Sequence, residues 1–197
     1  MLSGPDGSGK STQLDLLKKD LEAAGKKVYA FHAVQFSIVN RIARTIQPSR
    51  RTEPGKTKSV TKASWISVQI RKAALLVDLF FFNVLRKMLA KENYDYIISD
   101  RYFYDTVVNI IFLSRSRFSL LLPLIERLIP APDTSIFLSV PTEKIMQRSE
   151  APEQGIEYVE KKAQIFTEKI SLWNYQTVNA DQSPENVFGE IKEAINP

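Results

Sequence analysis

Residues 4–11 form a glycine-rich segment that ends in lysine and serine. They fit the phosphate-loop pattern G-x-x-x-x-G-K-[ST]. Glycines let a backbone turn tightly enough for successive N–H groups to face one anion, and the helix that follows adds its positive N-terminal end. In this pattern Lys10 reaches the β- and γ-phosphates and the Ser11 hydroxyl ligates Mg²⁺. The predicted phosphate-binding residues are Gly4, Pro5, Asp6, Gly7, Ser8, Gly9, Lys10, Ser11 and Thr12.

The alternative to a phosphate loop is a glycine-rich surface turn. A strand pattern, although a short one, precedes the segment, and a helical pattern begins at Ser11. A strand before the glycines and a helix after them is the context that the phosphate loop requires. The flanking residues therefore favour a phosphate site over a plain turn.

A second candidate site, Asp100-Arg101, ends the apolar strand pattern of residues 96–99. In open parallel sheets, ligands bind outside the carboxyl ends of the strands. An aspartate there can hold Mg²⁺ directly or through water, and an adjacent arginine can bind a phosphate with two hydrogen bonds. The alternative is a strand-end ion pair, but a phosphate loop in the same chain favours the site. Ser11 and Asp100 are therefore the predicted metal-binding residues.

The hydrophobic patterns predict one α/β domain, residues 1–197, with a mostly parallel five-stranded sheet between helices. The first strand, before the loop, is short. The other elements are expected as helix 12–24, strand 27–31, a helix over 34–45, a basic loop at 47–56, a long helix from about 59 to 91 that is broken at most once, strand 96–100, one or two helices over 104–129, strand 135–140, helix 143–148, helix 156–175, strand 176–180 and a last helix from 183.

Composition excludes several classes of protein. The chain has 44% hydrophobic and 25% charged residues and a net charge of +5, which suits a small phosphate-bearing ligand and shows no basic run typical of nucleic-acid binders. With no cysteine and one histidine, it has no disulfide and few ligands for zinc. Because we find neither a membrane span nor a leader pattern, we expect a cytoplasmic protein.

Four segments together resemble the thymidylate kinase family and keep the family's order over nearly the whole chain. They are the phosphate loop with Asp6, the triplet Asp100-Arg101-Tyr102, residues 137–143 and residues 178–187. The resemblance implies a P-loop kinase three-layer fold with a short lid at about 144–160. It also implies transfer of the γ-phosphoryl group of Mg-ATP to a nucleoside monophosphate, dTMP, to give dTDP. Such a transfer needs positioning and charge neutralisation and no protein nucleophile.

The resemblance assigns roles to individual residues. Lys10 would hold the ATP phosphates, Asp6 would approach the sugar hydroxyl of the acceptor, and Arg101 would hold the acceptor phosphate. The predicted catalytic residues are Lys10, Arg148, Asp6 and Arg101. The predicted acceptor-binding residues, which belong partly to a region at about 35–75, are Asp6, Arg51, Arg71, Phe80, Arg101, Tyr102 and Asn109.

The sequence departs from the family where the acceptor phosphate and base are read. The family's Thr-Arg-Glu-Pro-Gly loop keeps Glu-Pro-Gly here, but its arginine precedes the threonine, as Arg51; the alternative is a solvated basic loop. The family's base-reading arginine falls at Asp78 or Leu79 and is therefore absent, and Arg71 is the candidate substitute. Base specificity stays open on these grounds.

The resemblance indicates two further regions that could contact the base. Phe80 could present an aromatic face to it, against the alternative that this aromatic cluster packs in the core or at a dimer contact. In place of the family's base-reading Tyr-Gln pair, this chain offers Asp105, Thr106 and Asn109. Asn109 could pair with a base edge; its alternative is a helix-surface amide.

The lid has one candidate catalytic cation. The family places an arginine either in the phosphate loop or in the lid, and Gly7-Ser8 excludes the first form. Arg148 is the only arginine after position 127, so we expect it to act on the transferring phosphate as an arginine finger. The alternative is a cation at a helix end, and whether a lysine shares the task stays open.

Two alternative functions stay open, and the sequence also predicts an oligomeric state. A related kinase could act on another nucleotide or on a nucleoside, and a nucleotide-binding switch could bind without phosphorylating an acceptor. The Asn-Lys-x-Asp base reader of GTPase-type switches is absent. The apolar residues of helix 66–88 exceed what one sheet face would cover, which predicts a homodimer.

Overall fold

The protein is described by a computed structural model that covers residues 1–33, 65–114, 121–147, 152 and 154–195. The predicted helix over 34–45, the basic loop at 47–56 and the start of the long helix lie outside these residues. Within them, no helix is both long and apolar enough to cross a membrane.

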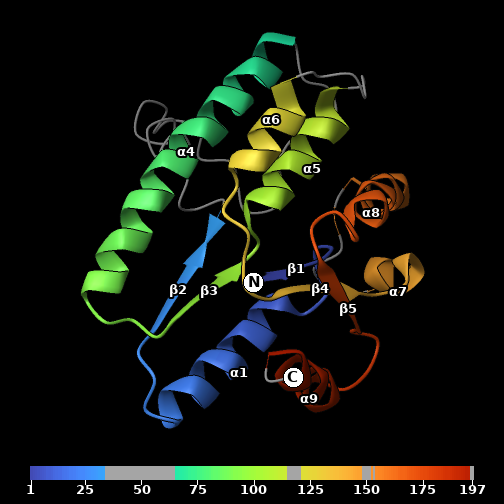
Figure 1. The fold of residues 1–197 in the computed structure, drawn as a ribbon. Helices are drawn as coiled ribbons and strands as arrows, with labels where there is room; N and C mark the ends of the chain where they lie inside the picture. The colour runs from blue at the N-terminus through green and yellow to red at the C-terminus, as the bar shows by residue number, and fades with distance from the viewer. Residues whose placement is uncertain (34–64, 115–120, 148–151, 153, 196–197) are drawn as a thin grey trace, which may run out of the picture.

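A parallel sheet forms the centre of the molecule, with strand order β2-β3-β1-β4-β5 (Figure 1). The strands are β1 (Leu2–Ser3), β2 (Val28–His32), β3 (Tyr96–Asp100), β4 (Ser135–Ser139) and β5 (Tyr175–Asn179). Leu2 of β1 and His32 of β2 both pair with Asp100. Because every strand is parallel, all carboxyl ends share one edge, and β1 delivers the glycine-rich loop to that edge.

Helices cover both faces of the sheet. In chain order they are α1 (Lys10–Ala23), α4 (Trp65–Lys91), α5 (Phe103–Ser114), α6 (Leu121–Leu128), α7 (Thr142–Gln147), α8 (Ile156–Lys169) and α9 (Pro184–Ile195). Figure 1 shows α4, α5 and α6 over one face and α1 with α9 over the other. Each face has its own apolar core, with Phe82 and Phe103 central to one and Leu17 and Ile136 to the other. The predicted fold class is confirmed.

Most elements lie where the sequence predicted them, but α8 ends earlier. It was expected to continue to Tyr175; it stops at Lys169, and Tyr175 opens β5. The chain turns at Asn174, whose φ of 51° is left-handed, and buried Trp173 packs its ring on Tyr104 at 4.5 Å. Tertiary packing thus ends a helix that the local pattern would continue.

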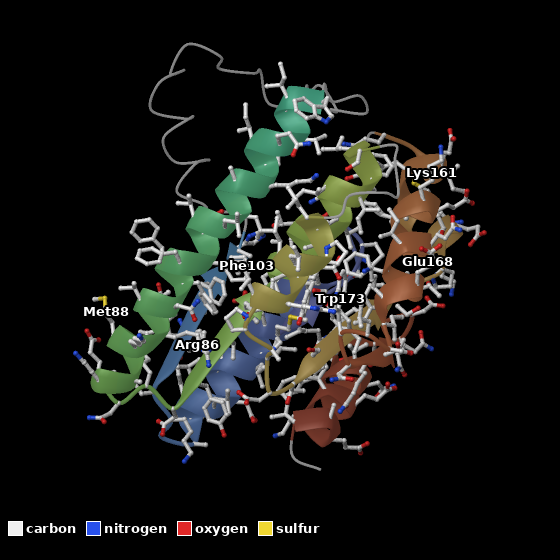
Figure 2. The ribbon with its side chains drawn as sticks, turned by 45° about the horizontal axis from the view of Figure 1, so that its top comes forward. Arg86, Met88, Phe103, Lys161, Glu168 and Trp173 are labelled. Carbon is white, nitrogen blue, oxygen red and sulfur yellow. The ribbon has the colours of Figure 1, made fainter. Side chains whose placement is uncertain are left out.

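The long helix α4 has an inward and an outward apolar face. Leu75, Leu79 and Phe82 are buried, at the three- and four-residue steps of one helix face. Its other face exposes large apolar side chains, namely Ile66, Ile70, Leu76, Val77, Phe80, Phe81, Val84 and Met88. Figure 2 shows Met88 projecting outward from α4, whereas Phe103 lies in the interior.

Candidate functional site

The phosphate loop needs glycine at two positions for different reasons. Gly4 has a φ of 153°, and a Cβ there would lie 2.7 Å from the Leu138 carbonyl oxygen. Gly9, with a φ of 89°, is the N-cap of α1 and provides no side-chain cap. The first turn of α1 therefore directs N–H groups and a partial positive charge toward the loop.

The loop and the end of β3 meet, as the sequence predicted. The Ser11 hydroxyl donates a hydrogen bond of 2.8 Å to Oδ2 of Asp100. Lys10 is buried at the start of α1, and its ammonium donates to the carbonyl oxygen of Pro5 at 2.6 Å. Because β1 and β3 are neighbouring parallel strands, these groups, about ninety residues apart in the chain, share one edge.

The donor atoms at this point fit a magnesium ion. Oδ2 of Asp100 accepts from Ser11, whereas Oδ1 is buried and has no hydrogen-bond partner among the described residues. Magnesium prefers oxygen ligands and is usually held by one or two protein groups together with substrate phosphates. Ser11 and Asp100 supply that minimal set.

A cavity of about 370 Å³ opens at this edge of the sheet. Its lining combines the phosphate loop with the ends of β2 and β3: Asp6, Gly7, Gly9, Lys10, Ser11, Thr12, His32, Asp100 and Arg101. The other residues predicted to bind the ATP phosphates lie outside this lining: Gly4 and Pro5 line a smaller cavity, and Ser8 is buried. Six of the nine residues predicted from the sequence to bind phosphate therefore line this one concave surface.

Arg101 links the phosphate loop to α5. Its φ of 64° is left-handed, which is rare for a residue with a side chain, while its N–H donates to the Leu2 carbonyl at 2.9 Å. The guanidinium forms an ion pair with Asp6, and its Nη1 lies 3.5 Å from Oδ1 of Asp105. Strained backbone held by its surroundings is common at ligand sites.

Asp105 is buried at the base of this cluster, with 2% of its side chain exposed. Its Oδ2 accepts hydrogen bonds from the Ser3 hydroxyl at 2.6 Å and from the N–H of Tyr102 at 3.0 Å. The hydroxyl of Tyr175 donates to Ser3 at 2.9 Å, and burial, followed by the Asp105 charge, raises the pKa of Tyr175. The sequence had offered Asp105 only as a possible replacement for a base reader. Arg101 precedes α5 and has a left-handed backbone, so no helical spacing pointed to this ion pair.

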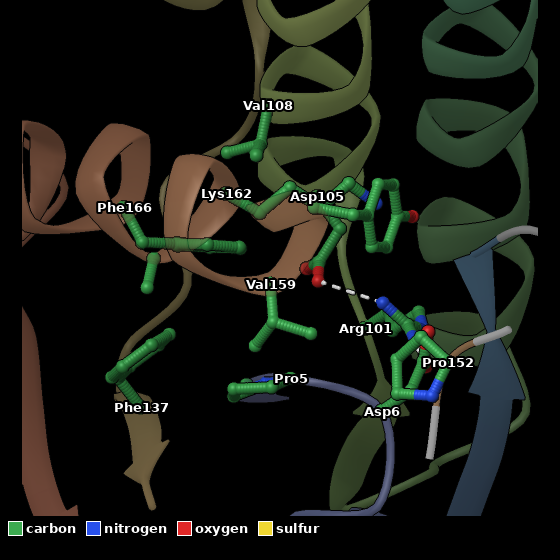
Figure 3. Close-up of a pocket in the computed structure, with 13 residues that line it drawn as sticks. Pro5, Asp6, Arg101, Asp105, Val108, Phe137, Pro152, Val159, Lys162 and Phe166 are labelled. Carbon is green, nitrogen blue, oxygen red and sulfur yellow. Dashed lines mark hydrogen bonds and ion pairs between the residues drawn. The ribbon is translucent and has the colours of Figure 1, made fainter. Parts of the chain in front are cut away.

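A smaller cavity of about 30 Å³ lies on the other side of Asp6 and Arg101, with room for roughly one water molecule (Figure 3). Lys162 of α8 lines it, with its ammonium 4.5 Å from the centre of the Tyr158 ring. Burial, then the charge of Arg101, lowers the pKa of Lys162 to about 8, against the opposing effect of Asp105.

Lys162 was not identified from the sequence. In α8 it follows an exposed lysine and reads as part of the polar face. Its spacing from Val159 and Phe166, three and four residues away, was the missed signal, because both of those residues are buried.

Three predicted acceptor residues line neither of these cavities. Arg71 is exposed, but it precedes the buried residues Leu75 and Asp78 by four and seven positions and so shares their side of α4. Phe80 is 66% exposed, whereas the adjacent Leu79 is 3% exposed, because the inward face of α4 is set by Leu79 and its helical neighbours. Tyr102 is buried, and its hydroxyl donates to the Pro130 carbonyl at 2.8 Å, away from the loop.

Of the remaining predicted residues, Asn109 lies on a described element and the other two do not. Asn109 is half-buried on α5 and lines neither cavity. Arg51 and Arg148 lie outside the described residues. On α4, the inward face also carries two buried charged residues that the sequence did not single out, Lys72 and Asp78.

A parallel sheet with a phosphate loop after β1, and with the β3 carboxylate bonded to the serine of that loop, defines a P-loop nucleotide-binding protein. Comparison with known proteins narrows this class. The model of the family described as thymidylate kinase matches residues 2–191, and the chain belongs to this family. The chain is therefore an ATP-dependent nucleoside monophosphate kinase.

A thymidylate kinase of Thermosipho africanus (strain TCF52B) is similar along its length. It is 27% identical over 207 residues, which cover 98% of this chain and 94% of that protein.

Proposed function

We propose that this enzyme transfers the γ-phosphoryl group of Mg-ATP to dTMP. The observation that carries the proposal is the 2.8 Å hydrogen bond between Ser11 and Asp100 beside the phosphate loop. It brings the amides, the lysine and a metal-binding carboxylate to one place, as a bound triphosphate requires. The match to the thymidylate kinase family, and a relative of that name, support dTMP as the acceptor.

On the donor side, the first-turn amides of α1 and Lys10 bind the ATP phosphates. Ser11 and Asp100 hold Mg²⁺, which neutralises charge on the phosphates when bound. The ammonium of Lys10 contacts the Pro5 carbonyl at 2.6 Å, so it already lies over the loop. Little reorientation is then needed to meet a phosphate, which favours catalysis by preorganisation.

On the acceptor side, Arg101 binds the acceptor phosphate and Asp6 meets the sugar hydroxyl. Their ion pair places both side chains between the two cavities. Arg51 and Arg148 remain proposed contacts to the acceptor phosphate and to the transferring group, and Asn109 to the base. The acceptor region at about 35–75 and the lid at about 144–160, within one domain, remain predictions, as does the cytoplasmic location.

An acceptor screen tests the function. The enzyme is incubated with Mg-ATP and, separately, dTMP, the other common monophosphates and the nucleosides, and ADP is measured. We expect ADP only with an acceptor present and the highest kcat/KM with dTMP. ATP hydrolysis at the same rate with every acceptor and with none would contradict kinase function and support a nucleotide-binding switch.

The screen includes other bases because of one observation on α4. Where the family's base-reading arginine falls, the inward face carries Asp78 and Leu79, both buried. A leucine cannot donate hydrogen bonds to a base. A second candidate function is therefore phosphorylation of a monophosphate other than dTMP, indicated by a higher kcat/KM for that acceptor.

We further propose that the enzyme is a homodimer that buries the outward apolar face of α4. Contiguous exposed apolar surface on a globular protein marks an interaction site, and two-fold dimers are the commonest oligomers. The face includes Phe80, whose ring packs edge-on against Phe81 at 5.5 Å.

Sedimentation velocity tests the dimer. We expect wild type to sediment as a dimer and Phe80→Glu as a monomer, because a charge would be desolvated at the contact. Arg71→Glu, a change on the same helix but away from the apolar side chains, is the control. A wild-type monomer at every concentration would refute the proposed dimer.

A further inference from the structure

The two carboxylates that contact Arg101 differ in their access to water. The side chain of Asp6 is 47% exposed, and that of Asp105 is 2% exposed. If the guanidinium of Arg101 turns toward a phosphate, water can solvate Asp6. Asp105 borders only the smaller cavity, which has room for about one water molecule, and a buried carboxylate left without a cation is strongly destabilised.

If Arg101 turned toward a phosphate, the Oδ1 atom of Asp105 would lose its ion-pair partner. Oδ2 has two hydrogen-bond donors, Ser3 and the N–H of Tyr102. Oδ1 is buried and has no hydrogen-bond partner among the described residues; Nη1 of Arg101, at 3.5 Å, is its ion-pair partner. Binding a phosphate through Arg101 therefore requires another cation at Oδ1, or the acceptor affinity falls.

Lys162 is placed to supply that cation. Figure 3 shows it extending from α8 into the cavity that Asp105 and Arg101 also line. Its ammonium lies over the Tyr158 ring and forms no ion pair within the described part of the chain. The flexible four-carbon stem of a lysine can turn its ammonium between two nearby partners.

We propose that Lys162 is a positioning residue that neutralises Asp105 while Arg101 binds the acceptor phosphate. The inference rests on the proposed acceptor role of Arg101. It gives α8, whose first residues overlap the predicted lid segment, a part in controlling acceptor affinity. Lys162 acts through Asp105 and Arg101 and need not touch the substrate.

The proposal implies a pH dependence. The charged or titratable groups facing the Lys162 ammonium are Arg101 from the turn after β3, Asp105 from α5, Lys10 from α1, Asp6 from the loop and Tyr158 from α8. Burial and the neighbouring cations lower the pKa of Lys162 to about 8. Above that pH the amine is neutral and cannot compensate Asp105, so KM for the acceptor should rise.

Steady-state kinetics with dTMP varied and Mg-ATP saturating, on both sides of pH 8, test this role. For Lys162→Gln at neutral pH we expect KM for dTMP to rise on the order of 10- to 100-fold, with a smaller change in kcat and no further rise above pH 8. Lys162→Arg should keep a low KM for dTMP and should not show the rise in KM above pH 8, because arginine stays charged.

Lys161→Gln is the matched control. Lys161 neighbours Lys162 on α8, but it is exposed and pairs with Glu157 at 2.5 Å. Figure 2 shows its side chain at the periphery of the molecule. We expect wild-type KM and a wild-type pH profile. If Lys162→Gln behaves like this control, the proposal is overturned.

A double-mutant cycle tests whether Lys162 acts through Asp105. With Asp105→Asn the buried charge is gone, so adding Lys162→Gln should raise KM no further. If the two effects on KM instead multiply, Lys162 does not act through this carboxylate.

An NMR titration of the Lys162 side chain gives a readout without substrate. We expect a protonation midpoint near pH 8 in wild type and a lower one in Asp105→Asn, because the Asp105 charge raises the pKa of Lys162. An unchanged midpoint would overturn the pairing. If wild type phosphorylates no monophosphate, the proposed function and the acceptor role of Lys162 both fall, and the titration still decides whether the pair exists.

Discussion

The donor side and the acceptor side of this site are built in different ways. On the donor side, one continuous segment shapes the backbone: Gly4 and Gly9 take conformations with positive φ, and α1 starts directly after them. On the acceptor side, Arg101 and Asp105, four residues apart, meet Lys162 from the distant helix α8 as side chains. A backbone-built subsite tolerates few substitutions, whereas a side-chain cluster can exchange residues between its elements. The departures from the family pattern in this chain lie on the acceptor side.

The largest effect should come from the donor side. Lys10→Ala removes the cation over the phosphate loop, and we expect kcat to fall on the order of 10³-fold with every acceptor. ADP formation measures it. Lys18→Ala, an exposed change on the same helix that loses only the contact with Glu22, should leave kcat unchanged. Turnover within a few-fold of wild type in Lys10→Ala would show that the loop does not hold the donor.

On the acceptor side, Arg101→Ala should act mainly on one substrate. We expect KM for dTMP to rise on the order of 100-fold and KM for ATP to change little, because a charged partner of the acceptor phosphate is lost. Arg127→Ala, a change of an exposed arginine on α6 that lines neither cavity, should change neither constant. Equal effects of Arg101→Ala on both KM values would remove the distinction between the two sides.

The smallest effect concerns stability. The pKa of Lys162 is about 8 in the folded protein, below its ordinary value of 10.5. Between pH 8 and pH 10.5 the unfolded chain therefore binds more protons than the folded chain, and the stability of wild type rises with pH. Lys162→Met, which removes the half-buried charge, should therefore raise Tm by a few degrees at neutral pH, with a gain that shrinks above pH 8. Thermal unfolding at several pH values measures it, with Lys161→Met as control. A lower Tm would show that the ammonium stabilises the fold.

The missed residues show where local patterns lose their information. Phe80 and Leu79 are adjacent and both apolar, and only the packing of α4 on α5 decides that Leu79 is buried. The pattern of α8 would continue past Lys169, but burial of Trp173 and the pairing of Tyr175 in β5 end it. Lys162 reads as a surface residue until α8 is placed against the loop.

The sequence by itself determined the phosphate loop and the order of the strands along the chain, since glycine conformation and strand patterns are local. It also predicted that Ser11 meets Asp100, because the carboxyl ends of parallel strands share one edge of a sheet. Only the tertiary structure decided which charges share the acceptor cavity. That outcome depends on the rotation and docking of α4, α5 and α8. Many apolar side chains along the whole length of these helices fix that docking, and no single motif encodes it.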